Sequence, residues 1–279
     1  MTQPTRRSFL RGVSSLAAAS ALSGTGLALT ASAASAQVQP LTGKTPAGVK
    51  ALFYDVFGTL VDWRTGVARE GQRILGPLGY SLDWIAFADA WRAEYQPAME
   101  EIRAGRQPFS RLDVVHRSML ERIRPRFGLE NVDEAVLREL NLAWHRLDAW
   151  PGVTEGLRKL RTRYRQAPVS NGNIALMADL ARRNDILWDA ILGAEVAGDY
   201  KPKPRVYLVA AEAFGLTPEQ CMFCAAHAGD LQAAAKLGFR TGFITQYDEF
   251  GRGKGETSPG IPVDVLAPNF KEFARVMTE

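Results

Sequence analysis

The chain has 279 residues, of which 46% are hydrophobic and 23% charged. This composition is typical of a soluble globular protein with one sizeable domain, or with a core domain that carries an inserted one. Positions 1–36 hold three basic and no acidic residues, so the rest of the chain has 31 basic against 30 acidic side chains. A nearly neutral body excludes an extended basic surface, and we expect neither nucleic acid nor a membrane as a partner.

The first 36 residues are predicted to be an export signal. A twin-arginine motif, Thr5–Arg11, precedes a moderately apolar stretch, Val13–Leu29, and two small-residue cleavage sites, Ala31–Ala33 and Ala34–Ala36. The stretch is rich in Ser, Gly and Ala and poor in Leu, Ile and Phe, which disfavours a membrane anchor. We therefore expect cleavage of the signal and a periplasmic or secreted protein.

A linker is predicted at 37–48, followed by a buried strand at 49–54. This run is apolar except for Lys50, as in a parallel strand covered on both faces, and it ends at Asp55 before a Gly58-Thr59 turn signal. From 65 to 146 apolar residues recur at helical spacing without strand-like alternation. We predict a helical cap domain at 65–146, inserted into a core domain made of 49–64 and 147–279.

The second part of the core alternates between predicted strands and helices. The strands are expected at 167–169, 190–196, 221–226, 240–244 and 263–266, and the helices at 154–163, 174–183, 204–214 and 230–237. Such alternation predicts an α/β fold with a doubly wound parallel sheet. Pro168 cannot donate to a strand ladder, so the strand at 167–169 is expected to be short or irregular.

Two cysteines, Cys221 and Cys224, have the spacing C-x-x-C. In a strand, residues three apart lie about 10 Å from each other on opposite faces. A disulfide needs Cα atoms within about 7 Å. We therefore predict that both thiols pack in the core and form neither a disulfide nor a redox motif.

The informative polar residues each follow a predicted strand. Asp55 follows the first, Ser170-Asn171 the second, 199–202 the third and 227–230 the fourth. Because ligands of open α/β sheets bind at the carboxyl ends of the strands, these four segments are expected to form one site.

These motifs resemble those of the haloacid dehalogenase superfamily. In chain order they are Asp55-x-x-Gly-Thr-Leu, Ser170-Asn-Gly, Lys201-Pro-x-Pro-x-x-Tyr207 and Gly229-Asp230-Leu. Within the superfamily the chain is most similar, over about 49–270, to the L-2-haloacid dehalogenases, and its Trp91-Arg92 matches their cap arginine. The resemblance implies a Rossmann-like core with a helical cap, and a hydrolase that converts short 2-haloalkanoic acids to 2-hydroxy acids through an aspartyl ester on Asp55.

Phe57 separates this chain from the phosphatases of the superfamily, which have an acid two residues after the nucleophile. A halide leaves as a stable anion and needs no proton, whereas the alcohol of a phosphoester needs one. Phosphatases also have a further acid next to Asp230 or four residues on, where this chain has Leu231 and Ala234. Two charged ligands are few for Mg²⁺, so no cofactor is expected. Two alternatives stay open: a Mg²⁺-dependent phosphohydrolase, and a non-catalytic protein that binds a small carboxylate.

The catalytic roles follow from charge and from the resemblance. Asp55 must be ionised to attack, and a nearby Lys201 would lower its pKa. Asp230 is expected to steer the water that breaks the ester, and Thr59 to bond the nucleophile. Tyr207 is expected either to bond Lys201 or Asp230, or to pack in the core.

The resemblance also implies a binding site for the 2-halo acid. Ser170 and the backbone amides of Val56 and Phe57 would hold the carboxylate, while Arg92 and Asn171 would receive the halide or orient the substrate. A homodimer is a further possibility that the sequence leaves open.

His227 departs from the family pattern, which has Asn there, as does Ala225, where the pattern has Ser. An imidazole could act as general base for ester hydrolysis, or stay neutral and make the hydrogen bonds of Asn. His116 and His145 lie in helical stretches without ligand-like partners, so we expect packing or surface roles and no zinc site.

Overall fold

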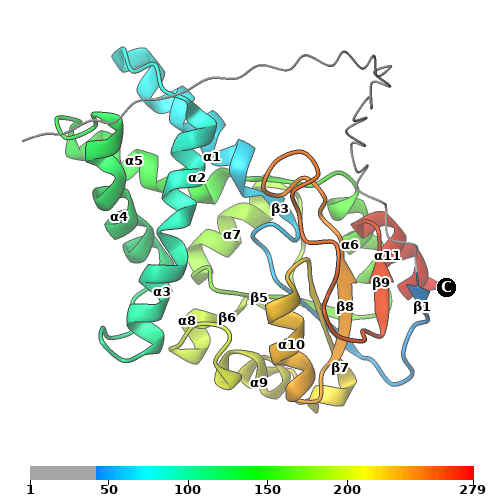
Figure 1. Cartoon of the computed structure of the whole chain (residues 1–279). Helices are drawn as coiled ribbons and strands as arrows, with labels where there is room; N and C mark the ends of the chain where they lie inside the picture. Colours follow the sequence, from blue (N-terminus) through cyan, green and yellow to red (C-terminus); the bar gives the residue numbers. More distant parts are fainter. Residues whose placement is uncertain (1–41) are drawn as a thin grey trace, which may run out of the picture. The chain divides into compact units, whose positions relative to one another are not determined.

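The computed structural model describes residues 42–279, which belong to one compact unit (Figure 1). The predicted export signal at 1–36, and 37–41 of the predicted linker, lie outside the described residues. Within the remainder of the predicted linker, Thr42–Gly43 forms strand β1.

Seven strands form the central sheet in the order β1-β9-β8-β7-β2-β5-β6. After β1 they are β2 (Ala51–Tyr54), β5 (Arg165–Ser170), β6 (Leu192–Gly193), β7 (Cys221–Ala225), β8 (Arg240–Ile244) and β9 (Val265–Ala267). All neighbours pair in parallel except β1 and β9. The predicted parallel α/β fold is confirmed.

Both faces of the sheet are buried, and β2 shows why. Leu52 and Tyr54 belong to one hydrophobic core, and the alternating residues Ala51 and Phe53 belong to the other. A strand covered on both sides loses almost all contact with water, which explains its continuous apolar run.

The helices of the core flank this sheet. They are α6 (Val153–Leu160), α7 (Ile174–Arg183), α8 (Ala194–Ala197), α9 (Pro204–Ala213), α10 (Ala228–Lys236) and α11 (Phe270–Thr278). Phe270 and Phe273 of α11 pack in the core layer that holds Tyr54, whereas Val206 and Ala210 of α9 pack in the other. No helix in the part of the chain that the structure describes has the length and apolar character needed to cross a membrane.

Between β2 and β5 the chain forms the predicted helical segment. It contains α1 (Trp63–Leu75), α2 (Trp84–Ala93), α3 (Tyr95–Arg103), α4 (Leu112–Ile123) and α5 (Glu134–Asn141). Its two ends are held together by an antiparallel pair, β3 (Val61–Asp62) with β4 (Asp148–Ala149). The side chain of Asp62 caps α1 by accepting from the Thr65 amide at 3.0 Å, so α1 begins two residues earlier than predicted.

The strand predicted at 190–196 is largely wrong. Only Leu192–Gly193 is extended, and the chain continues as the short helix α8. Gly193 has a φ of 113°, and a Cβ placed there would lie 2.3 Å from the carbonyl oxygen of Ser170. The close approach to β5 requires glycine, and the positive φ ends the strand.

Pro168 lies inside a regular six-residue strand, so the expectation of a short or irregular strand is wrong. The Arg165 amide donates towards β2, to the Lys50 carbonyl, whereas the Gln166 amide donates to Asp189 on the other side. Because this direction alternates along a parallel strand, the nitrogen of Pro168 faces away from β2. It lies on the β6 side of the strand, where the pairing with β6 begins only at Val169, so no ladder donor is lost.

The two cysteines are free and buried, as predicted. Cys221 lies in the core layer that contains α9, and Cys224 lies in the opposite layer. Their side chains therefore point to different faces of β7.

Candidate active site

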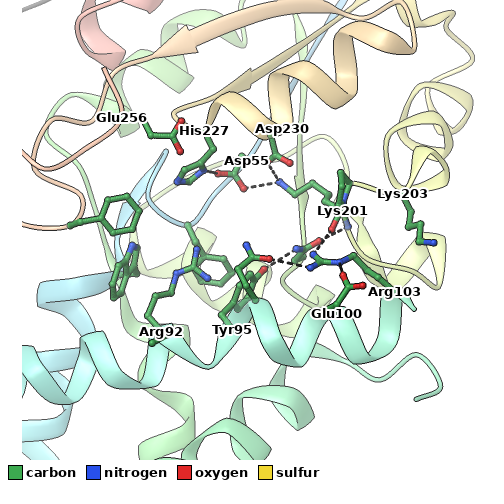
Figure 2. Close-up of a pocket in the computed structure, with 18 of the residues that line it drawn as sticks. Asp55, Arg92, Tyr95, Glu100, Arg103, Lys201, Lys203, His227, Asp230 and Glu256 are labelled. Carbon is green, nitrogen blue, oxygen red and sulfur yellow. Dashed lines mark hydrogen bonds and ion pairs between the residues drawn. The ribbon is translucent and has the colours of Figure 1, made fainter. Parts of the chain in front are cut away.

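The predicted site residues meet at the carboxyl end of the sheet (Figure 2). Asp55 directly follows β2, and Asn171 follows β5. His227 lies between β7 and α10, and Asp230 is in the first turn of α10. Lys201 lies in the loop after α8, where a third strand end was expected.

Three groups contact the carboxylate of Asp55. Thr59 Oγ1 donates to Oδ2 at 2.8 Å, Lys201 Nζ donates to Oδ1 at 2.8 Å, and His227 Nδ1 lies 2.9 Å from Oδ2. Burial alone would raise the pKa of Asp55, but the positive charge of Lys201 and the contacts of His227 lower it well below its usual value. The carboxylate is therefore held ionised, as a nucleophile requires.

Lys201 joins two carboxylates. Its ammonium donates to Asp230 Oδ2 at 2.5 Å as well as to Asp55, and its side chain is only 5% exposed. Burial opposes the charge, yet the two carboxylates together raise the pKa of Lys201 above its usual value. Tyr207 donates its hydroxyl proton to Asp230 Oδ1 at 2.8 Å, which is one of the two bonds considered for it. Asp230 thus uses both oxygens to hold Lys201 and Tyr207.

His227 contacts a second carboxylate that sequence reasoning missed. Glu249 Oε2 lies 2.9 Å from His227 Nε2, and Glu249 Oε1 accepts from Trp63 Nε1 at 3.0 Å. Burial lowers the pKa of His227, but the contacts with Asp55 and Glu249 outweigh it and raise the pKa well above its usual value. The raised pKa favours a protonated imidazole between the two carboxyl groups over the neutral substitute for Asn.

These groups face a pocket of about 1030 Å³. Of the predicted residues it is lined by Asp55, Phe57, Arg92, Asn171, Lys201, His227 and Asp230. The predicted residues Val56, Thr59, Ser170 and Tyr207 are not among its lining residues. Ser170 is fully buried and accepts from the Gly172 amide at 3.0 Å, so here it stabilises the turn after β5.

The helical segment contributes directly to the site. The guanidinium of Arg92 lies 4.1 Å from the centre of the Tyr95 ring, a cation–π contact. Asn171 donates its amide to the Tyr95 hydroxyl at 2.8 Å and accepts from the Lys201 amide at 2.9 Å. Arg103, at the end of α3, donates to the Lys201 carbonyl at 3.1 Å. In this structure Asn171 connects the helical segment to Lys201.

Among the described residues, Asp55, His227 and Asp230 form the one group whose ligand atoms lie close enough to hold a metal ion. The donor set fits a divalent cation poorly. The Lys201 ammonium already bridges Asp55 and Asp230, and the raised pKa of His227 favours a protonated ring beside Asp55. A metal ligand nitrogen must be free of a proton, so the arrangement favours a metal-free site.

The two remaining histidines lie in the helical segment. His116 is buried and stacks on Trp144 with ring centroids 4.3 Å apart, and burial lowers its pKa to about 3, which agrees with the predicted packing role. The expectation that His145 has no ligand-like partners is wrong. Its ring nitrogens lie 2.9 Å from Asp113 and 2.7 Å from Asp179, and it joins α4 to α7 through these carboxylates.

Comparisons with known proteins agree with this geometry. The family model described as haloacid dehalogenase-like hydrolase matches residues 49–238. The (S)-2-haloacid dehalogenase 4A of Burkholderia cepacia is 30% identical, over 69% of this chain and 81% of its own length. The crystal structure of an L-2-haloacid dehalogenase is 41% identical with a TM-score of 0.77, and covers 82% of this chain and 98% of its own. That of a defluorinating L-2-haloacid dehalogenase is 37% identical with a TM-score of 0.79, and covers 85% and 99%. The chain therefore belongs to the haloacid dehalogenase-like hydrolases, and within them to the group of the L-2-haloacid dehalogenases.

Proposed function

We propose that this protein hydrolyses the carbon–halogen bond of short 2-haloalkanoic acids and releases 2-hydroxy acids, without a cofactor. The observation that carries the proposal is the carboxylate of Asp55. It is ionised and held between Lys201 and His227 at the wall of the pocket, and a phenyl ring, Phe57, occupies the position of a phosphatase acid. Relatives with the names of haloacid dehalogenases support it.

In the first step one oxygen of Asp55 attacks C2 of the substrate. A carbon–oxygen bond forms, the carbon–halogen bond breaks, and the halide leaves with the bonding electrons. Arg92 is the cation suited to receive the halide or the substrate carboxylate, because it lines the pocket and its contacts are with aromatic rings rather than acids. The configuration at C2 inverts once.

In the second step water attacks the carbonyl carbon of the Asp55 ester. The water oxygen stays on Asp55, the former Asp55 oxygen leaves with the product hydroxyl, and one proton is released. Esterification removes the negative charge that lies 2.9 Å from His227 Nδ1, so the pKa of His227 falls at this stage. His227 can then lose its proton and act as the base, while Glu249 fixes the orientation of the ring.

Isotope labelling tests the covalent step. A single turnover in ¹⁸O-water is expected to label Asp55 and not the 2-hydroxy acid, whereas direct attack by water would label the product. Substrates for the assay are the two enantiomers of 2-chloropropionate, and the inverted product is expected from the L form. Phosphoester hydrolysis that EDTA abolishes and Mg²⁺ restores would instead identify a phosphohydrolase.

Two further proposals concern parts that the described site does not include. The twin-arginine motif predicts that the enzyme is exported and acts in the periplasm or outside the cell. A fusion of residues 1–40 to a reporter tests this, with a control in which Arg6 and Arg7 are both replaced by lysine.

The helical segment at 65–146 is proposed to act as a cap domain. Sedimentation of the purified protein would establish whether the protein forms a homodimer.

A further inference from the structure

One end of the pocket is lined by aromatic rings. Phe250, in the loop between β8 and β9, packs against Trp63 with ring centroids 6.0 Å apart, and Trp63 stacks on Trp144 at 6.3 Å. Phe250 is 37% exposed, and in the described part of the chain it is the one exposed large hydrophobic side chain that lines this pocket. An apolar ring open to water inside a pocket is a contact surface for an apolar part of a ligand.

The aromatic end adjoins the reacting groups. Phe250 follows Glu249, which contacts His227, which contacts Asp55. Trp63 donates to the same Glu249. The Arg92 guanidinium lies 5.6 Å from the centre of the Trp63 ring, so the cation expected to meet the halide or carboxylate also borders these rings.

The other end of the pocket is charged and cannot hold an apolar group equally well. Arg103 pairs there with Glu100 at 3.1 Å and donates to the Lys201 carbonyl, and Lys203 also lines this end (Figure 2). An apolar substituent placed against these groups would strip water from charges without replacing it. Asp89, Arg92 and Glu256 also line the pocket, so the direction towards Phe250 is favoured by its aromatic rings and not by an absence of charge.

The volume of the pocket points the same way. A 2-halopropionate has six non-hydrogen atoms and fills at most roughly 180 Å³, if each atom takes the ~30 Å³ of a liquid water molecule. The pocket measures about 1030 Å³, a volume at the upper end of the range for drug-sized ligands. A three-carbon substrate would leave most of it to water.

We propose that this site takes 2-halo acids with an aryl substituent better than their methyl counterparts, and that Phe250 determines this specificity. The aryl ring lies against Phe250 and Trp63 while C2 faces Asp55. The chemistry is unchanged: an Asp55 oxygen bonds to C2, the halide leaves, and the aryl group takes no part. The inference rests on the proposed dehalogenase function and names its substrate class.

The test compares bromide release from (S)-2-bromopropionate and (S)-2-bromo-3-phenylpropanoate, which share the leaving group and differ by one phenyl ring. Wild type is expected to show the higher kcat/KM on the phenyl substrate. Phe250→Ala should lower that value about three- to tenfold, the range expected for one aromatic contact, and should lower the value for 2-bromopropionate by a clearly smaller factor. Phe250→Tyr keeps the ring and should retain the preference.

Leu78→Ala is the matched control, because Leu78 is an exposed hydrophobic residue, 54% exposed, that does not line the pocket. Thermal melting of each variant establishes that it is folded. If 2-bromopropionate reacts and the phenyl substrate does not, or if Phe250→Ala lowers kcat/KM equally for both, the inference is wrong while the proposed function stands. If neither acid releases bromide, the proposed function itself is wrong and the inference falls with it.

Discussion

Replacement of Glu249 by glutamine removes the negative charge beside His227 Nε2 and keeps a side chain of nearly the same shape. The two groups lie 2.9 Å apart, and Glu249 is 1% exposed, so the contact is a buried charge-assisted hydrogen bond. Such bonds contribute about 1.5–3 kcal/mol. Because this bond favours the protonated imidazole, Glu249→Gln should lower the pKa of His227 from its raised value.

The same change should make stability depend differently on pH. The pKa of His227 is raised in the folded protein, so its stabilising contribution is fully present below the unfolded-state pKa and is lost as the pH rises through the folded-state pKa. Glu249→Gln should therefore unfold more easily than wild type at mildly acidic pH, and the difference should close at alkaline pH. Urea unfolding at several pH values measures this.

The assay for the pKa itself is a histidine NMR titration over about pH 5 to 10. The chain has three histidines, so three imidazole signals can be assigned by single substitutions. His116, whose pKa is lowered to about 3, should stay neutral throughout and serve as an internal reference.

Glu256→Gln is the matched control, because Glu256 lines the same pocket and accepts from the Ala228 amide at 2.8 Å. It should leave the His227 titration nearly unchanged. A wild-type His227 that titrates at or below its usual pKa, or a Glu249→Gln variant that titrates as wild type does, would refute the electrostatic reasoning.

Three further changes test the rest of the site. Asp55→Asn should lower halide release at least about 10³-fold without unfolding the protein, and appreciable remaining turnover would exclude Asp55 as the nucleophile. Lys201→Met leaves the buried Asp55 and the partly buried Asp230 without their cation, so it should cost about 3–5 kcal/mol in urea unfolding. Because the pKa of Asp55 then rises, the acidic limb of the pH–rate profile should move to higher pH, and an unmoved limb would contradict the pairing. Arg103→Gln removes the bond to the Lys201 carbonyl and should lower kcat/KM about tenfold, whereas Arg106→Gln, on an exposed pair with Glu101, should match wild type.

The strand-end residues could be predicted because their position depends on local pattern. A buried strand is recognisable from its apolar run, and parallel strands bring their carboxyl ends to one edge. Asp55, Asn171 and Asp230 therefore met where expected, and the structure adds the distances. Lys201 was also placed at this edge, although a short helix, not a strand, precedes it.

Glu249 could not be predicted, because nothing local marks it. It lies in the irregular stretch between β8 and β9, 22 positions from His227 and 186 from Trp63, and the loop brings the three together only in the folded chain. The same holds for Arg103, whose contact with the Lys201 carbonyl spans 98 positions. Spacing within a sequence indicates which residues share an element, but not which loop closes over which strand.

The two-residue strand β1 covers one margin of the central sheet. Thr42 and Gly43 pair with Leu266 and Val265, so β9 does not form the outer margin of the sheet. A strand left bare at that margin offers unpaired amides and carbonyls to other molecules. A chain that begins after residue 36 would keep this cover, whereas a chain shortened beyond Gly43 should be prone to aggregate.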